Sequence, residues 1–117
     1  MSATMQNSYG TINFDESMLA KLAGLAAMDC YGLVGMASNK VSDGIVKLLN
    51  MENLERGVKV TTKGSSVAIK LSIIIEYGVS LATVANNVID TVKYKVEYTT
   101  GLSVERVDVV VADIRVN

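Results

Sequence analysis

The chain of 117 residues contains no histidine, no proline and no tryptophan, and its one cysteine is Cys30. Histidine is the commonest general base and metal ligand in proteins, so its absence removes the residue on which most acid–base and metal sites depend. A single cysteine can form neither an intrachain disulfide nor a cysteine-based metal framework. These absences predict a protein that is not an enzyme, with no catalytic residues and no metal site.

The chain also lacks an excess of charge of either sign, because 11 basic and 12 acidic residues leave a net charge of −1. Proteins that bind nucleic acids usually carry surplus lysine and arginine, so no nucleic-acid partner is expected. Residues 1–7 include neither the basic nor the apolar segment of a signal peptide. The longest apolar stretch, Leu19–Met28, contains Lys21 and is too short to span a bilayer. We therefore expect a cytoplasmic protein without direct membrane insertion.

Half of the residues are hydrophobic and 20% are charged, which is typical of a folded soluble domain. The length matches one domain. We predict a flexible N-terminus at residues 1–8 and a single α+β domain over residues 9–117.

The first half of this domain is predicted to contain a strand at Tyr9–Phe14 and a helix from about Glu16 to Met28. Asp15 is the expected N-cap, and a capping box from Asn13 to Glu16 is the alternative. One broad apolar face is predicted for this helix at helical spacing, formed by Met18, Leu19, Leu22, Leu25 and Ala26. A glycine inside a helix costs about 1 kcal/mol relative to alanine, and close approach of a neighbouring backbone would account for Gly24.

Two further elements are expected before the middle of the chain. Tyr31–Ala37 is apolar with glycines at 32 and 35, which predicts a short extended segment or irregular strand. Asp43–Met51 is predicted to be a short helix, capped by Ser42 or Asp43.

The clearest alternation of apolar and other residues predicts two strands, Val58–Thr61 and Val67–Glu76. Lys63–Ser66 lies between them and contains glycine, so the two strands should form a hairpin. The alternation indicates a sheet with one buried face and one mostly polar face.

The last part of the chain is predicted to be a long helix, Ser80–Tyr98, followed by the strand Ser103–Val116, with Gly101 ending the helix. The helix has an apolar stripe with a spacing of three to four residues, formed by Leu81, Val84, Val88, Val92 and Val96. The apolar face of the strand switches midway, which implies a bulge or burial on both sides. The order β-α-β-α-β-β-α-β predicts an α+β fold, a small mixed sheet with helices packed mainly on one face.

Acidic and thiol side chains offer few candidates for chemistry. Asp15 and Glu16 are best explained by the favourable position of anions at a helix N-terminus. Asp108 and Asp113 are five residues apart on a strand, so they point to opposite faces unless a bulge intervenes. Cys30 follows a helix end, where the helix dipole disfavours a thiolate, and we interpret it as a buried structural thiol.

Gly32 and Gly35 match the GxxG motif of KH domains, which clamps a nucleic-acid backbone. The alternative is a packing segment in which glycine lets two elements approach closely. Tyr94 and Tyr98 are one helical turn apart, so they either form an exposed aromatic pair for an interface or pack on the sheet edge.

Five lysines could form a small basic area: Lys59, Lys63, Lys70, Lys93 and Lys95. The first three belong to the polar side of the predicted hairpin, whereas Lys93 and Lys95 point about 200° apart around a helix axis and cannot share a face. A solvated surface is one interpretation, and a patch for an acidic partner or a membrane surface is the other.

Several segments resemble a known family. They are the run from Asp29 to Ser38, then Gly57–Val60, Val92–Tyr94 and Gly101–Val104. Together they resemble the alkaline shock protein family, also called the envelope stress response family of Gram-positive bacteria, and most closely its YloU-like branch. The resemblance covers about Tyr9 to Val116.

The resemblance implies a cytoplasmic, non-enzymatic protein without known cofactors or catalytic residues. Some family members are held at the membrane by a membrane-anchored partner and are linked to envelope or alkaline stress. YloU-like members tend to be encoded beside a fatty-acid kinase component, which implies a link to lipid metabolism.

The expected function is therefore that of an interaction or scaffold protein in the envelope stress response or envelope homeostasis. We expect a protein partner, either a membrane-anchored protein or a fatty-acid kinase component, or self-association into a homo-oligomer. The sheet edge at Val107–Val116 is the expected docking site. A small-molecule or acyl-chain binder and a KH-like nucleic-acid binder are the alternatives.

Overall fold

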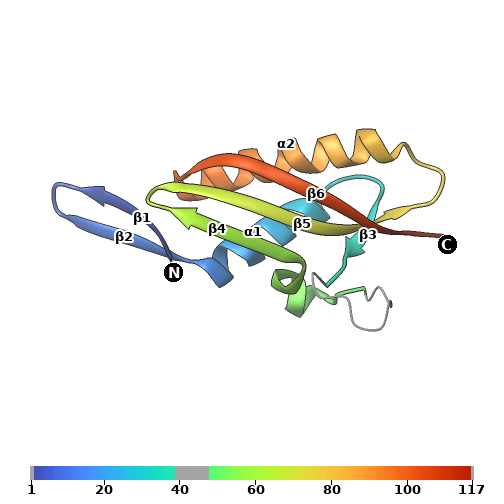
Figure 1. Ribbon diagram of the computed structural model, residues 1–117, viewed down its shortest axis with the longest axis horizontal. Helices are drawn as coiled ribbons and strands as arrows, with labels where there is room; N and C mark the ends of the chain where they lie inside the picture. Colours follow the sequence, from blue (N-terminus) through green and yellow to red (C-terminus); the bar gives the residue numbers. More distant parts are fainter. Residues whose placement is uncertain (1, 39–47, 117) are drawn as a thin grey trace.

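The computed structural model describes residues 2–38 and 48–116 (Figure 1). Its elements follow the chain in this order: β1 (Ser2–Asn7), β2 (Gly10–Asp15), α1 (Glu16–Met28), β3 (Leu33–Met36), the 3₁₀ helix η1 (Met51–Gly57), β4 (Val58–Lys63), β5 (Ser66–Glu76), α2 (Leu81–Thr100) and β6 (Ser103–Arg115). The predicted α+β class and order are confirmed, with one additional strand at the start.

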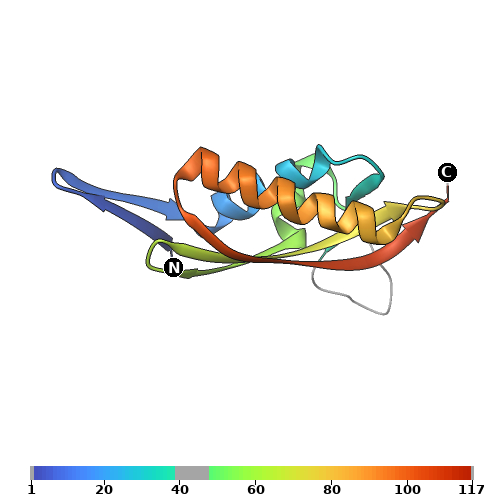
Figure 2. The same cartoon turned by 90° about the horizontal axis from the view of Figure 1, so that it is seen from above.

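Strand β5 is the centre of a four-stranded mixed sheet. Strand β6 runs parallel to β5 along its whole length, and β4 and β3 pair antiparallel with successive parts of β5 on its other side. A parallel pair requires a crossover connection, which α2 provides between β5 and β6. Both α1 and α2 lie on the same face of this sheet, as Figure 2 shows, so the predicted layering is confirmed.

The core lies between the two helices and the helix-side face of the sheet. The valines of the predicted α2 stripe, Val84, Val88, Val92 and Val96, are buried, whereas Leu81 at the start of the helix is exposed. The side chain of Ser80 caps α2 by accepting a hydrogen bond from the backbone N–H of Thr83. Gly101 ends the helix with a left-handed φ of 80°, as predicted from its position.

Two bulges interrupt the pairing of β6 with β5. The register passes from Val104 to Arg106 and again from Val111 to Asp113, which leaves Glu105 and Ala112 without a partner residue in β5. The second bulge explains why the apolar face of β6 switches midway. Of the two predicted explanations, a bulge or burial on both sides, it confirms the bulge. In β5, by contrast, Ser72 and Ile74 are buried on the face predicted to be mostly polar.

The prediction that the first structured residues begin at Tyr9 was wrong, because strand β1 covers Ser2–Asn7. Strand β1 pairs antiparallel with β2 in a hairpin that extends from one end of the fold (Figure 1). The backbone N–H of Thr4 donates to the carbonyl oxygen of Gly64 at 2.9 Å, and Ala3 is fully buried. Residues 2–7 are mostly polar, so these distant contacts hold a strand that local periodicity does not indicate.

The predicted helix at Asp43–Met51 lies largely outside the described residues. Within them, Leu48 forms an isolated antiparallel bridge with Ala37, and the backbone N–H of Leu49 donates to the carbonyl oxygen of Met36. The prediction was therefore wrong at Leu48 and Leu49, which pair as extended backbone. The short helix present is η1, which starts at Met51 and buries Leu54.

Helix α1 has the predicted bounds but not the predicted orientation. Its buried residues are mostly small: Leu19, Ala20, Ala23, Gly24, Ala26 and Ala27. A Cβ at Gly24 would lie 3.0 Å from the Cβ of Leu54 in η1 and 3.5 Å from the Leu54 carbonyl oxygen. The expected close approach of a neighbouring backbone is confirmed.

This contact predicts that a large side chain at Gly24 destabilises the fold. Gly24→Leu should lower the free energy of unfolding by about 2 kcal/mol, because overpacking a tight contact forces the surrounding elements apart. Lys21→Leu introduces the same side chain on the exposed side of α1 and should change it by less than about 0.5 kcal/mol. Urea-induced unfolding followed by circular dichroism measures the free energy of unfolding of both variants. Equal losses of stability in the two variants would contradict the close packing assigned to Gly24.

Candidate functional site

The part of the chain that the structure describes contains no group of three or more acidic, histidine or cysteine side chains placed to hold a metal ion. The Cys30 thiol is partly buried and donates a weak hydrogen bond to the carbonyl oxygen of Asn87, with an S···O distance of 3.8 Å. A Cβ at Gly32 would lie 2.8 Å from a methyl group of Val84, and one at Gly35 would lie 2.6 Å from a methyl group of Leu48. The GxxG glycines therefore serve packing, which favours that interpretation over a phosphate clamp.

The bulge at Ala112 places Asp108 and Asp113 on the same face of the sheet, because their partners in β5 are Lys70 and Ile74. Each aspartate is paired with an arginine on β6. Arg106 donates to Asp108 at 2.9 Å, and Arg115 Nε donates to Asp113 at 2.7 Å. The hydrogen bond from Arg115, followed by that from the Ile114 backbone N–H, holds the pKa of Asp113 below its ordinary value. These ion pairs favour surface carboxylates over an acid–base pair.

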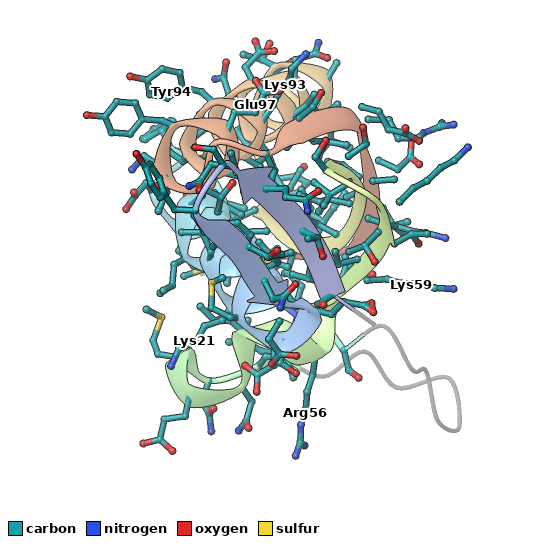
Figure 3. The ribbon with its side chains drawn as sticks, turned by 90° about the vertical axis from the view of Figure 1, so that its left-hand side faces the viewer. Lys21, Arg56, Lys59, Lys93, Tyr94 and Glu97 are labelled. Atoms are coloured by element: carbon teal, nitrogen blue, oxygen red, sulfur yellow. The ribbon has the colours of Figure 1, made fainter. Side chains whose placement is uncertain are left out.

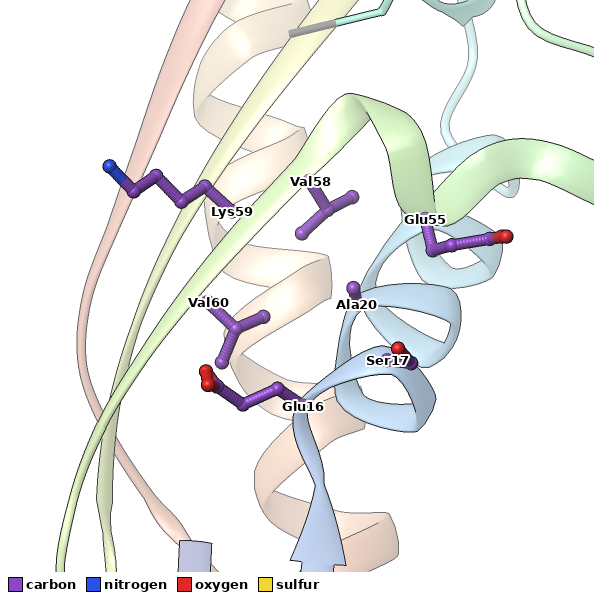
Figure 4. A pocket seen from close by; sticks show the side chains of 7 residues that line it. All are labelled: Glu16, Ser17, Ala20, Glu55, Val58, Lys59 and Val60. Carbon is purple, nitrogen blue, oxygen red and sulfur yellow. The ribbon is translucent and has the colours of Figure 1, made fainter. Parts of the chain in front are cut away.

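A shallow hollow of about 250 Å³ opens beside the start of α1 (Figure 4). Glu16, Ser17 and Glu55 contribute its polar groups, and Ala20, Val58, Lys59 and Val60 complete the lining. One carboxylate oxygen of Glu55 is buried there without a hydrogen-bond partner. Figure 4 shows that Lys59 extends to the side of β4 opposite Val58 and Val60. The hollow therefore offers two carboxylates and one hydroxyl group, with no histidine or thiol among its lining residues.

A second hollow, of about 280 Å³, lies between the two helices and η1 and is mainly apolar. We call it the α1–α2 groove, and its lining is Leu22, Leu25, Ala26, Met28, Asp29, Met51, Lys95 and Thr99. Met18, Leu25 and Met51 are 41%, 38% and 56% exposed. The predicted broad apolar face of α1 is therefore wrong in part, because Leu19 and Ala26 point into the core while Met18 and Leu25 reach solvent.

Two tyrosines of α2, Tyr94 and Tyr98, precede in the chain the groove residues Lys95 and Thr99. Tyr94 and Tyr98 stack with ring centroids 5.9 Å apart, and they are 64% and 79% exposed, so the exposed aromatic pair is the arrangement present. Figure 3 shows Tyr94 on the same flank of the molecule as Lys21 of α1. Lys95 forms an ion pair with Asp29 at the end of α1, and that hydrogen bond raises the pKa of Lys95.

Strand β6 is an edge of the sheet, as its predicted docking role requires. It pairs with β5 alone, and no strand among residues 2–38 and 48–116 pairs with its outer side. Val110 and Val111 are exposed between the two bulges. Bulges and charged side chains usually protect an edge from pairing, so the docking role of β6 stays a prediction.

The sheet face opposite the helices collects three of the five predicted lysines. Lys59 and Lys70 lie on this face together because they are directly opposite each other on neighbouring strands. Lys63 follows Lys59 by four residues on β4, and every second side chain of a strand lies on the same face. Lys93 points elsewhere, as Figure 3 shows, and Lys95 is paired with Asp29. Among the described residues, neither α1 nor α2 combines the length and the apolar content that a membrane-spanning helix requires.

Comparison with known proteins gives a consistent result. The model of the alkaline shock protein family, which is described by a "cell envelope-related function", matches residues 4–116. YloU of Bacillus subtilis (strain 168) is 44% identical over 117 residues, which is 99% of this chain and 98% of that protein. Spy1614 of Streptococcus pyogenes serotype M6 is 30% identical over 99% of this chain and 97% of its own length.

More distant relatives are longer than this chain. A protein of Streptococcus pyogenes serotype M1 named "Stress response regulator gls24 homolog" is 31% identical over 91% of this chain but only 59% of its own length. None of the named relatives bears the name of an enzyme. No solved structure matches the chain significantly. The resemblance inferred from the sequence is confirmed: the chain belongs to the alkaline shock protein family, whose function is related to the cell envelope.

Proposed function

We propose that the protein is a non-enzymatic interaction module that docks a protein partner in the α1–α2 groove and acts in the envelope stress response or envelope homeostasis. The family match supports the envelope context. The observation that carries the docking role is the mainly apolar groove itself, in which the side chains of Leu25 and Met51 are exposed to solvent. Met18 is also exposed, one helical turn before Leu22 of the groove.

The chemistry of the groove suits a protein partner. Exposed apolar patches rimmed by polar groups are typical of interaction sites. Methionine side chains are flexible and polarisable, so they adapt to different partner surfaces. Tyrosine is enriched at interfaces, and Tyr94 and Tyr98 are exposed on α2, next in the chain to Lys95 and Thr99 of the groove. The Asp29–Lys95 pair at the edge supplies charges that orient a partner.

Met18, Leu22 and Leu25 follow one another at helical spacing on α1, and Leu22 and Leu25 line the groove. A stripe of this kind matches an amphipathic helix laid into the groove, with apolar residues every three to four positions. We include in the proposal the partners implied by the family, a membrane-anchored protein or a fatty-acid kinase component, and self-association as an alternative use of β6. The "stress response regulator" name of a relative supports the link to stress.

An acyl-chain binder is less well supported. Acyl chains are usually enclosed, since most of a bound ligand's surface is buried in its pocket. The α1–α2 groove is not enclosed but open to solvent. Addition of a fatty acid should therefore leave the thermal unfolding midpoint unchanged.

Site-specific photo-crosslinking in a Gram-positive host tests which surface contacts protein. A benzophenone amino acid at Met51 should give defined protein adducts, because this side chain lies in the groove. The same probe at Tyr77, which is exposed beyond the end of β5, is the control and should give none. Adducts from Tyr77 with none from Met51 would reject the groove as the docking site.

Complementation tests whether the groove matters in the cell. In a strain lacking this protein, the double variant Leu25→Ser with Met51→Ser should fail to restore growth under envelope stress. The matched control, Ile12→Ser with Val116→Ser, removes two exposed apolar side chains elsewhere and should restore it. Both variants should unfold within about 1 kcal/mol of the wild type, because the replaced side chains are exposed. Full rescue by the groove variant would contradict the proposal.

A further inference from the structure

The face of the sheet opposite the helices carries a cluster of cations on three strands. Lys59 and Lys63 come from β4, Lys70 from β5 and Arg106 from β6. Their partners across the strands place all four side chains on the same face, since Lys59 is opposite Lys70, Lys63 is opposite Ser66 and Arg106 is opposite Ala68. We call this cluster the basic sheet face.

The direct opposition of Lys59 and Lys70 is unfavourable for the isolated protein, because like charges at facing positions of two strands repel. Asp108 is the facing residue of Lys70 on the other side, but its carboxylate is paired with Arg106. In the part of the chain described, no carboxylate forms an ion pair with any of the three lysines. The cluster therefore keeps a surplus of positive charge on a chain whose net charge is −1.

The surplus is confined to one half of the face. The opposite half, near the ends of β5 and β6, carries Glu76 and Asp113 together with Arg115. Between the lysines lies a shallow hollow of about 190 Å³, lined by Lys59, Thr61, Ala68, Ile69, Lys70 and Asp108. Figure 2 shows that neither helix covers this side of the sheet.

We propose that the basic sheet face binds the anionic headgroups of phospholipids at a membrane surface. Its cations are spread over three strands of a sheet and do not converge on one point, which suits an array of headgroups better than a single small anion. An acidic protein is a poorer match, because the centre of a protein interface is usually apolar. The hollow at the centre of this face is lined mainly by polar and charged residues, namely Lys59, Thr61, Lys70 and Asp108, with Ala68 and Ile69 as its apolar residues.

The inference is independent of the proposed protein docking. The α1–α2 groove lies on the helix side of the molecule and the basic sheet face on the other, so one molecule can engage a lipid surface and a protein together. Substitution of Leu25 and Met51 should leave lipid binding unchanged, and loss of the lysines should leave protein docking in the groove intact. The two proposals can therefore fail separately.

Vesicle co-sedimentation of the full chain tests the inference. The protein should bind vesicles of phosphatidylcholine mixed with phosphatidylglycerol and not vesicles of phosphatidylcholine alone, and added salt should weaken binding. Each cation removed should reduce binding about fivefold, so Lys59→Gln with Lys70→Gln should reduce it about 30-fold. Lys21→Gln with Lys93→Gln removes the same charge from the two helices, away from this face (Figure 3), and should retain most of the binding.

Three results would overturn the inference. The first is no binding to the mixed vesicles at low salt. The second is an equal loss for the two double variants, which would mean that only net charge matters. The third is that the protein is retained on immobilised polyglutamate but does not bind vesicles, and that Lys59→Gln with Lys70→Gln abolishes this retention. That result would assign the face to an acidic protein partner.

Discussion

The close packing of the small face of α1 determines how the helix side of this protein is built. Ala20, Ala23, Gly24 and Ala27 point inward, and Gly24 leaves room for the backbone of η1 at Leu54. Small residues let neighbouring backbones approach closely, so the large β-branched and aliphatic side chains of α2 and the sheet fill the core instead. As a consequence, the side chains of Met18 and Leu25 are exposed at the surface, and Leu25 lines the α1–α2 groove.

The two-layer architecture separates two kinds of surface. The helix layer presents apolar methionine, leucine and tyrosine side chains around a groove, with one ion pair joining α1 to α2. The uncovered sheet face presents lysines and an arginine in cross-strand register. In the proposed function and the further inference, these surfaces bind a protein and a lipid surface. The fold then acts as an adaptor in a cell envelope-related family.

Much of the fold follows from local patterns in the sequence. The period-two residues of β4 and β5, the valine stripe of α2 and the left-handed Gly101 are all set by neighbours in the chain, and their elements were predicted. Strand β1 could not be predicted in this way, because it depends on pairing with β2 and with Gly64, about 60 residues away. The bulge in β6 was one of two explanations that the switched apolar face allowed, and the register decided between them.

The candidate surfaces were predictable to different degrees. Strand alternation indicated that Lys59, Lys63 and Lys70 share a face, but the place of Arg106 depends on the bulge at Glu105 and on parallel pairing with β5. The groove was missed because α1 is apolar on nearly every side, so periodicity cannot tell its buried face from its exposed one. The run of alanines and one glycine at helical spacing was the available signal, since only a small face permits close packing on η1.

The central claim, that the outward apolar side of α1 is a docking surface, is tested most directly by methyl NMR of the methionines in a purified complex with a photo-crosslinked partner identified from cells. The methyl groups of Met28 and Met51 report on the groove lining, and that of Met18 reports on the exposed side of α1. Met36 is buried in the core, and Met5 lies beside Gly101 at the C-terminal cap of α2. The account predicts shifts of the Met18, Met28 and Met51 signals on binding, with those of Met5 and Met36 unchanged. Unchanged groove signals together with a shifted Met5 signal would contradict it.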